Sequence, residues 1–497
     1  MFFNDFPYTD FHELNLDWIL RKMKELDQAM TDFEAMNKIT FSGAWDITKQ
    51  YPAWTIVNDG DQGYISIQPV PAGIVLGNND YWRGVVDYTA TIADLQNRVI
   101  VLETKMAAAE KWISNVRIAN VREYGAKGNG TDDDTTAIKS AIASGLPVYF
   151  PEGTYLITDK LDLASSHQLI FGAGYGSSRI KCDSCDCFNV TGSTRVQIED
   201  LRIDDAVDAI EISDNSSFCV LRNLYLNNFT QHGVYLHGEY FPSPTTDVIN
   251  TRIENVIARS SVGWGFRFYC VGDVNINNCY AGVSGGIGIL IDTGTSAVYG
   301  CGCNFAGCDT AGAIKDATHP DSSDGQRPIE PHNILLDQCL FDSSNICLLI
   351  QDAYDVALSN SWCAGSGDAG CKIVGDNVHD LRFSNTEFHS NTRSGAAIEG
   401  SNAGNNKYAV FTGCQFYKNT RDGLEIKNGS HVIAVGCEMR NNTRYGVTIG
   451  TGAADTMING CSIHDNTNSD LFPGTGLTDR NYVMTCVPVT LNNSDGM

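Results

Sequence analysis

The sequence is poor in proline and has no long apolar run. Only 13 of its 497 residues are proline, so the 48 glycines do not belong to a collagen-like or linker-like segment. No stretch approaches the roughly 20 apolar residues of a membrane-spanning helix, so we expect no membrane insertion. The first ten residues contain neither a basic segment nor an apolar core, which predicts that the chain carries no signal peptide.

Positive charge is also scarce. The chain has 34 lysine and arginine residues against 59 aspartate and glutamate residues, a formal net charge of −25. This balance argues against nucleic acid or an anionic membrane as a partner, because both need a basic face. The 17 cysteines are predicted to be free thiols, since disulfides belong to exported proteins.

Two segments near the start carry apolar residues at alternating steps of three and four, which is typical of coiled coils. We expect helices in residues 1–40 and a coiled coil in residues 90–117, with a single amphipathic helix as the alternative. The seam residues disagree about the number of chains, because the first seam favours a higher order and the second favours two strands. The first seam is Leu16, Ile19, Met23, Leu26, Met30 and Phe33, and the second is Ile92, Leu95, Val99, Leu102, Met106, Ala109, Ile113 and Val116.

Residues 41–89 lie between these helices and are rich in aromatic side chains. Turn signals at Asn58–Gly60 and Pro69–Gly73 predict a small β module. Its aromatic residues are expected to fill the core, and stacking on sugars is the alternative use. They are Trp45, Tyr51, Trp54, Tyr64, Tyr81 and Trp82.

The C-terminal two-thirds of the chain is repetitive. The pattern Asn-Thr-Arg-x-Gly begins at Asn391, Asn419 and Asn442, and a decayed copy begins at Asn466. Short alternating runs of apolar residues lie upstream of each copy. A repeat near 24 residues with polar turns predicts a β-solenoid.

A small or polar residue breaks each alternating run, and in six repeats a cysteine follows it. Because solenoid coils stack at about 4.8 Å, residues at one position form a ladder, and these thiols are expected to be packing residues. We expect the same of Cys182, Cys185 and Cys187, with a metal site as the alternative. The break positions are Asp200, Asn223, Asn255, Asn278, Gly302, Gln338, Asn360, Asn385, Gly413, Gly436 and Gly460, and the six cysteines are Cys279, Cys303, Cys339, Cys414, Cys437 and Cys461.

One segment resembles a known fold family. Val121–Ile138, followed by Val148–Tyr155 and Gly172–Gly174, resembles the opening of pectate-lyase-like right-handed parallel β-helices. The resemblance implies that residues 118–469 form an all-β solenoid. Asp132–Asp134 are expected to cap a helix, Thr135–Ser144, that closes the first coil.

The start of the chain, Phe6–Leu20, resembles the N-termini of tailspike and pre-neck appendage proteins of small podoviruses. The resemblance implies a homotrimer that joins other virion tail or neck proteins through residues 1–40. It also implies a virion location, assembly in the host cytoplasm and action at the host cell surface on a cell-wall or capsular polysaccharide. Residues 470–497 are expected to form a C-terminal cap or tail.

Two long insertions, residues 237–250 and 315–332, interrupt the repeat at the same turn. Three coils separate them, which is roughly 14 Å at the strand spacing, so they are predicted to wall a groove for a sugar chain. We expect catalytic roles for Glu239, Asp292, Asp316 and Asp324, and substrate binding by Tyr240, Phe241, Asp273, His319 and Arg327.

The reaction type stays open at this point. Hydrolysis of a glycan needs two carboxylates at a set separation. A lyase needs a base beside a cation that neutralises a uronate, and Arg327 or a bound calcium ion would supply it. No other cofactor or metal is expected. Within an acidic stretch, residues 199–211, Asp200 is expected to be structural, whereas Asp204 and Asp205 are candidates for a site between chains.

These observations leave several functions. The first is a phage appendage that binds a host-surface polysaccharide and cleaves it as a hydrolase or lyase. A non-enzymatic adhesin and a structural virion appendage are the alternatives of the same fold. The expected lack of a signal peptide disfavours a free cellular polysaccharide lyase.

Overall fold

The computed structural model describes residues 40–59, 62–85, 100, 101, 103–105, 118–238, 248–315, 330–375, 377–400, 406–473 and 482–484. The chain divides into two compact units, Met1–Arg117 and Ile118–Met497. No helix among these described residues is both long enough and apolar enough to cross a membrane. Among the same residues, no three His, Cys, Asp or Glu side chains gather into a group that could hold a metal ion.

The first unit contains a four-stranded sheet. Strand β1 (Thr40–Ala44) pairs in parallel with β2 (Thr55–Asp59), and β3 (Gln62–Ser66) and β4 (Trp82–Val85) continue the sheet antiparallel. Tyr51 and Trp82 pack edge to face in its core at 5.5 Å between ring centroids. Trp54 is half exposed, so the aromatic residues fill the core only in part.

The predicted coiled coil falls almost entirely outside the described residues. Ile100, Val101 and Glu103–Lys105 are helical. All the apolar residues of both predicted seams lie outside the described ranges. The coiled coil therefore stays a prediction.

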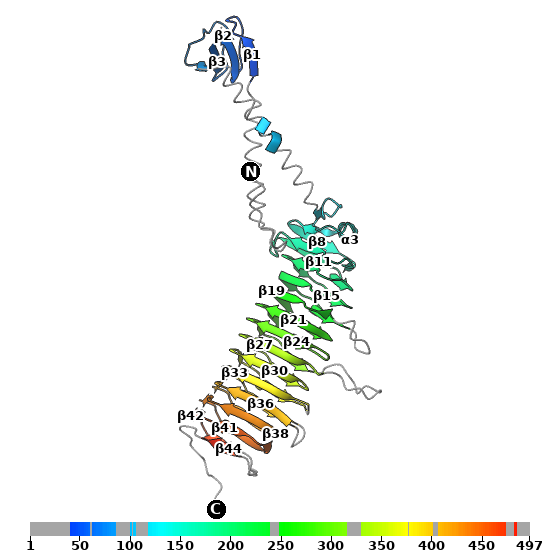
Figure 1. The fold of residues 1–497 in the computed structure, drawn as a ribbon, viewed down its shortest axis with the longest axis vertical. Coiled ribbons are helices and arrows are strands. Elements are labelled where there is room, and N and C mark those ends of the chain that lie inside the picture. Colours follow the sequence, from blue (N-terminus) through cyan, green and yellow to red (C-terminus); the bar gives the residue numbers. More distant parts are fainter. Residues whose placement is uncertain are drawn as a thin grey trace, which may run out of the picture. The chain divides into compact units, whose positions relative to one another are not determined.

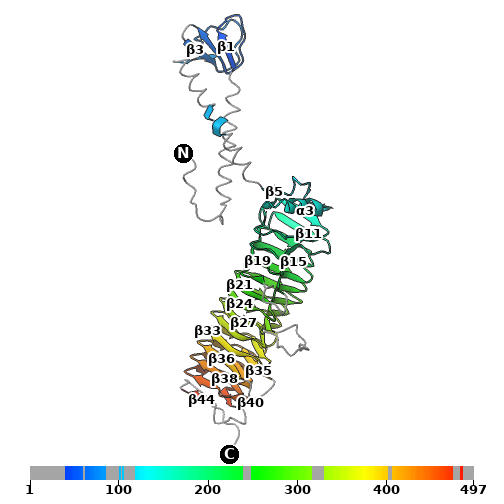
Figure 2. The same cartoon turned by 45° about the vertical axis from the view of Figure 1, so that its right-hand side comes forward.

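The second unit is a right-handed parallel β-helix, as the sequence predicts (Figure 1). Each coil contributes a strand to each of three parallel sheets, and Figure 2 shows the same stack of coils turned by 45°. Sheet 1 contains β5 (Ala119–Asn120), β7 (Val148–Phe150), β10 (Leu169–Gly172), β13 (Gln197–Glu199), β18 (Val248–Ile249), β21 (Val271–Asn277), β24 (Ser296–Cys301), β27 (His332–Asp337), β30 (Tyr354–Ser359), β33 (His379–Ser384), β36 (Asn406–Thr412), β41 (Met457–Asn459) and β44 (Tyr482–Met484).

Sheets 2 and 3 follow the same order along the stack. Sheet 2 contains β6 (Asn129–Asp133), β8 (Gly153–Ile157), β11 (Ser178–Cys182), β14 (Arg202–Asp204), β22 (Tyr280–Val283), β25 (Asn304–Ala306), β28 (Leu340–Asp342), β31 (Trp362–Ala364), β34 (Glu387–His389), β37 (Gln415–Tyr417), β39 (Glu438–Arg440) and β42 (Ser462–His464). Sheet 3 contains β9 (Leu161–Asp162), β12 (Phe188–Thr191), β15 (Asp208–Ser213), β17 (His232–His237), β20 (Trp264–Tyr269), β23 (Ile287–Ile291), β26 (Thr310–Lys315), β29 (Ile346–Gln351), β32 (Cys371–Val374), β35 (Ala396–Glu399), β40 (Tyr445–Ala454) and β43 (Ser469–Pro473).

Three long strands pass from one sheet into the next. Strands β16 (Val220–Asn227) and β19 (Arg252–Ser260) run from sheet 1 into sheet 2, and β38 (Leu424–Val435) runs from sheet 3 into sheet 1. Strands β43 and β44 pair with β40 and β41, so the β-helix continues past residue 469, where the sequence analysis ends it.

The break positions of the repeat are the corners between sheets 1 and 2. All eleven have positive φ, from 48° at Asn385 to 65° at Gly302, which explains why glycine, asparagine and aspartate dominate there. The following cysteines are buried, and several donate to carbonyls of their own and the neighbouring coil: the thiol of Cys303 donates to the carbonyl oxygen of Ile276 at 3.4 Å. The predicted packing role of the six cysteines is confirmed.

The Asn-Thr-Arg-x-Gly pattern has a similar origin at the corner before sheet 3. The buried amide of Asn419 donates to Oδ1 of Asn442 at 2.9 Å, and its own Oδ1 accepts from the amide of Asn391 at 2.9 Å. A Cβ on Gly423 would lie 2.5 Å from the carbonyl oxygen of Gly446, so only glycine allows the coils to stack so closely. The asparagine and the glycine of the pattern thus join one coil to the next.

Helix α3 (Thr135–Ala143) lies at the first coil, as expected (Figure 1). Ile138, Ala141 and Ile142 bury one face of it against the β-helix core. The expected cap differs in detail. The N-cap residue Asp134 turns its carboxylate to the backbone amides of Lys127 and Gly128, and Asp133 accepts from the amide of Thr135 instead.

Candidate functional site

Most of the predicted site residues lie outside the described residues. Glu239, Tyr240 and Phe241 fall in residues 239–247, and Asp316, His319, Asp324 and Arg327 fall in residues 316–329. Their roles remain predictions. The ends of the insertions are described: the first leaves the end of β17 at His237 and the second leaves the end of β26 at Lys315. Both therefore start from strands of sheet 3, three coils apart.

The other two predicted residues occupy different places. Asp292 follows β23 directly, is fully buried, and forms an ion pair with Nη2 of Arg267 at 3.0 Å. A fully buried carboxylate that is paired with Arg267 is suited to positioning that arginine. It is less suited to act as an acid or nucleophile, because these roles need access to a ligand. Asp273 is exposed within β21 of sheet 1 and has a positive φ of 53°.

The outer face of sheet 3 carries an unusual group of side chains on three neighbouring strands. In the register of β15, β17 and β20, Asp208 lies opposite His232 and Trp264, and Glu211 lies opposite Tyr235 and Arg267. His237 and Tyr269 form the next pair along the same strands. We call these eight residues the sheet-3 cluster: Asp208, Glu211, His232, Tyr235, His237, Trp264, Arg267 and Tyr269.

Two imidazoles in the sheet-3 cluster are each held by a carboxylate of the preceding coil. Nδ1 of His232 lies 2.6 Å from Oδ1 of Asp208, and Nε2 of His237 lies 2.7 Å from Oε1 of Glu211. The ring of Tyr235 stacks between them, at 4.3 Å from His232 and 4.5 Å from His237. A carboxylate on one ring nitrogen orients the imidazole and fixes which nitrogen carries the proton.

Arg267 lies in the same cluster and is enclosed by aromatic rings. Its guanidinium carbon is 4.4 Å from the ring centroid of Trp264, 5.0 Å from Tyr235 and 5.9 Å from Tyr269. Its side chain is only 12% exposed, and its Nε is buried without a hydrogen-bond partner. The buried charge of Asp292 compensates this cation.

Burial and hydrogen bonding shift three pKa values in the cluster, and burial is the largest cause of the raised pKa of the Tyr269 hydroxyl. Burial raises the pKa of the Tyr235 hydroxyl, although the charge of Arg267 acts in the opposite direction. The hydrogen bond from His237 lowers the pKa of Glu211, against the effect of burial. Glu211 is therefore held as a carboxylate at neutral pH, and Tyr235 as a neutral phenol.

The sequence reasoning assigned a role to none of these residues, although Asp208 and Glu211 lie in the acidic stretch 199–211 and His237 begins the first insertion. A signal was present in the repeat. In β17 and β20 the side chains that point outward lie one residue before a glycine and two and four residues after it. The segments His232–His237 and Trp264–Tyr269 both have this arrangement. Aligning the coils on Gly233 and Gly265 would have placed the aromatic and charged residues on one face.

The structure also differs from the expectation that Asp204 belongs to a site between chains. It lies in β14, is fully buried, and pairs with Arg179 and Arg202 of its own chain. Its charge is thus already neutralised within one chain, so it is not available for a site between chains. Asp200 has positive φ and accepts from the amide of Asn223 at 3.1 Å, which confirms its structural role.

Comparisons with known proteins support the fold class first. A family model described as right handed beta helix region matches residues 329–487, and one described as rhamnogalacturonase A/epimerase, pectate lyase-like, matches residues 118–185. The crystal structure of the pre-mature bacteriophage phi29 gene product 12 superposes with a TM-score of 0.55 at 18% identity, over 74% of this chain and 56% of that one.

Sequence relatives then narrow the class. The pre-neck appendage protein of Bacillus phage phi29 is 29% identical over 196 residues, which is 33% of this chain and 22% of that protein. The mannuronan C5-epimerase AlgE3 of Azotobacter vinelandii is 39% identical over 87 residues, 15% of this chain and 5% of that enzyme. The chain has phage pre-neck appendage proteins among its homologues, and it matches about a fifth of their length.

Proposed function

We propose that this protein is a virion appendage that binds a host-surface polysaccharide through the sheet-3 cluster. The observation that carries the proposal is the position of that cluster. Aromatic rings, imidazoles and an arginine share the outer face of sheet 3, and the two insertions leave strands β17 and β26 of the same sheet. Aromatic faces stack on sugar rings, and charged or hydrogen-bonding groups beside them orient the polymer.

The relatives support a virion role for the whole chain. Of the two sequence relatives described above, the phage pre-neck appendage protein matches the longer stretch of this chain. On the same basis we propose a homotrimer that joins other tail or neck proteins through its N-terminal residues and assembles in the host cytoplasm. The sixteen free cysteines of the described residues fit assembly in a reducing compartment.

Binding is tested with the full chain and purified surface polysaccharide of the host strain. Trp264→Ala removes the ring nearest Arg267 and is expected to weaken binding roughly tenfold, since an aromatic contact and its buried area contribute about 1.5 kcal/mol. Trp362→Ala is the matched control, because Trp362 is an exposed tryptophan of sheet 2. Equal weakening by both variants, or by neither, would remove the sheet-3 cluster from the proposal.

Cleavage of the bound polymer is a second candidate function, favoured by the two His–carboxylate pairs around Tyr235. Elimination from a uronate needs a base for the proton beside the carboxylate and a cation for the charge that develops there. A histidine would take that proton while the bond to the leaving glycosidic oxygen breaks, and the neutral phenol of Tyr235 would give a proton to that oxygen. Arg267, in its ion pair with Asp292, is the cation of the cluster. Hydrolysis is less favoured among the described residues, because Asp208 and Glu211 already accept from histidines.

Tyr235→Phe separates binding from cleavage, because it keeps the ring and removes the hydroxyl. We would follow polymer length, new reducing ends and the ultraviolet absorbance of unsaturated uronates. Shortening with absorbance that Tyr235→Phe or His232→Ala abolishes would establish a lyase. Reducing ends without absorbance would indicate a hydrolase, and binding without shortening an adhesin. Neither binding nor shortening would leave a structural appendage.

A further inference from the structure

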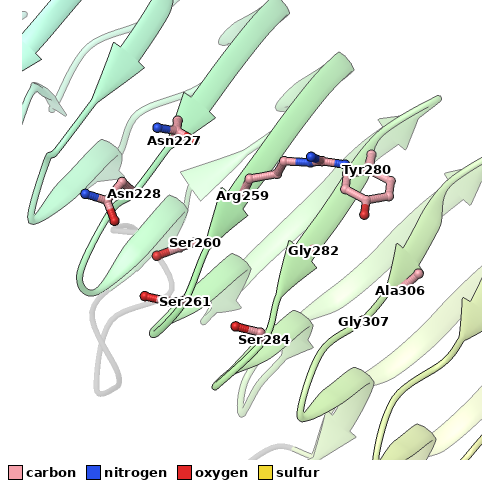
Figure 3. A pocket seen from close by; sticks show the side chains of 10 residues that line it. All are labelled: Asn227, Asn228, Arg259, Ser260, Ser261, Tyr280, Gly282, Ser284, Ala306 and Gly307. Carbon is pink, nitrogen blue, oxygen red and sulfur yellow. The ribbon is translucent and has the colours of Figure 1, made fainter.

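A hollow lies on sheet 2, beside the corner that leads from this sheet to sheet 3. It has a volume of about 620 Å³ and is formed by residues of four consecutive coils (Figure 3). We call it the sheet-2 groove. Its lining is polar, with asparagine and serine side chains around one arginine and one tyrosine: Asn227, Asn228, Arg259, Ser260, Ser261, Tyr280, Gly282, Ser284, Ala306 and Gly307.

The groove exists because two outward positions carry almost no side chain. Arg259 of β19 lies opposite Gly282 of β22, and Ala306 ends β25 on the next coil. A Cβ on Gly282 would lie 2.7 Å from the hydroxyl oxygen of Tyr280 and 3.1 Å from its ring. The ring of Tyr280 therefore lies against Gly282, and a larger residue there would displace it.

Arg259 lies over the same ring, with its guanidinium carbon 5.2 Å from the ring centroid of Tyr280. Sheet 2 has two other arginine–tyrosine contacts, and each of those arginines is neutralised. Arg202, over Tyr225, donates twice to Asp204, at 2.8 and 3.0 Å. Arg440, over Tyr417, pairs with Glu438 at 3.0 Å.

Arg259 differs because it is exposed and pairs with no carboxylate among the residues that the structure describes. In a chain with a net charge of −25, a cation left unpaired in a polar hollow is suited to an external anion. The aromatic ring beside it offers a face for a sugar, and the exposed hydroxyls of Ser261 and Ser284 lie along the edge of the groove (Figure 3).

We propose that the sheet-2 groove binds an acidic sugar, with Arg259 pairing with its carboxylate or phosphate group and Tyr280 stacking on its ring. The sheet-2 groove and the sheet-3 cluster have no residue in common. A polymer that reaches both therefore contacts the same chain at two places. Two weak contacts on one polymer raise the overall affinity well above that of either contact.

The test uses the full chain and calorimetric titration with four probes: a galacturonate oligomer, a sugar phosphate, a neutral glucose oligomer and inorganic phosphate. Arg259→Ala is expected to weaken binding of at least one acidic sugar about tenfold, because it removes a charge-assisted hydrogen bond. Gly282→Leu is expected to weaken it similarly by filling the groove. The acidic probe that loses affinity identifies the anion as carboxylate or phosphate.

Two matched variants control the experiment. Arg440→Ala removes an arginine with the same ring contact but a neutralised charge, and Trp362→Ala removes an exposed tryptophan elsewhere on sheet 2. Both variants are expected to leave this binding unchanged. The proposal is overturned if the neutral oligomer binds as well as the acidic ones. It is also overturned if Arg259→Ala and Gly282→Leu, melting like the unmodified chain, bind the acidic sugars with unchanged affinity, or if only inorganic phosphate binds.

Discussion

His232 and His237 show how the β-helix positions single side chains. Each imidazole projects from β17 and meets a carboxylate one coil away, at the strand spacing. That distance suits a direct hydrogen bond, so the register alone brings the partners together. The consequence is that the protonation of a carboxylate on one coil is linked to the orientation of a histidine on the next.

This linkage predicts a pH dependence of stability. The hydrogen bond from His237 lowers the pKa of Glu211 in the folded chain, so its stabilising contribution is complete above the unfolded pKa of about 4.3 and is lost as the pH falls through the folded value. Glu211→Gln is expected to be less stable than the unmodified chain by roughly 1–2 kcal/mol at pH 6. Thermal melting between pH 3 and 7 should show this difference shrinking below about pH 4.

Glu123→Gln provides the control, because Glu123 is an exposed residue before the first full coil. Its melting temperature is expected to follow that of the unmodified chain across the same range. A difference for Glu211→Gln that stays constant down to pH 3 would contradict the assigned hydrogen bond.

Among the strands and corners, the features that repeat in every coil could be predicted from the sequence. The break positions, the buried cysteines and the closing helix were predictable because each depends on local rules of turn geometry and alternation. The sheet-3 cluster was not predicted, because it depends on which coils lie side by side. His232 and Trp264 are 32 residues apart and become neighbours only once the first insertion is set aside.

The asparagine ladder at the corner before sheet 3 yields a prediction at this scale. The Asn419 amide donates to the carbonyl oxygen of Phe388 at 3.0 Å and to Asn442 at 2.9 Å. Asn419→Ala would leave these buried groups without partners and is expected to destabilise the chain by roughly 3 kcal/mol. The shift is measured as the midpoint of denaturant unfolding.

Asn345→Ala is the matched control for the ladder. Asn345 is exposed and donates to Asp309 at 2.7 Å on a neighbouring coil. Its loss is expected to change stability by no more than about 0.5 kcal/mol. Similar midpoints for both alanine variants would show that the ladder does not hold the coils together.

For the whole molecule, the sequence predicts an oligomer that depends on residues 90–117. If three chains associate, sedimentation equilibrium should give a mass of about 162 kDa, three times the 54.1 kDa of one chain. Leu102→Pro interrupts the second predicted seam and is expected to reduce that mass, since proline destabilises a helix interior by about 3 kcal/mol.

Glu103→Ala, next to the seam but not part of it, is expected to keep the mass of the unmodified chain. A mass of 54.1 kDa for the unmodified chain would exclude the trimer. An unchanged mass for Leu102→Pro would instead assign the association to other parts of the chain.

The stacking of like residues on successive coils also sets how such a protein can change over generations. A duplication of the 23 residues from Gly413 to Val435 would give every ladder position a new partner and would lengthen the β-helix by about 4.8 Å. A duplication that is not a whole number of coils would shift the ladders out of register unless the surplus entered a corner. The reach of this molecule is therefore inherited in whole coils, while surplus residues are accommodated in the corners between them.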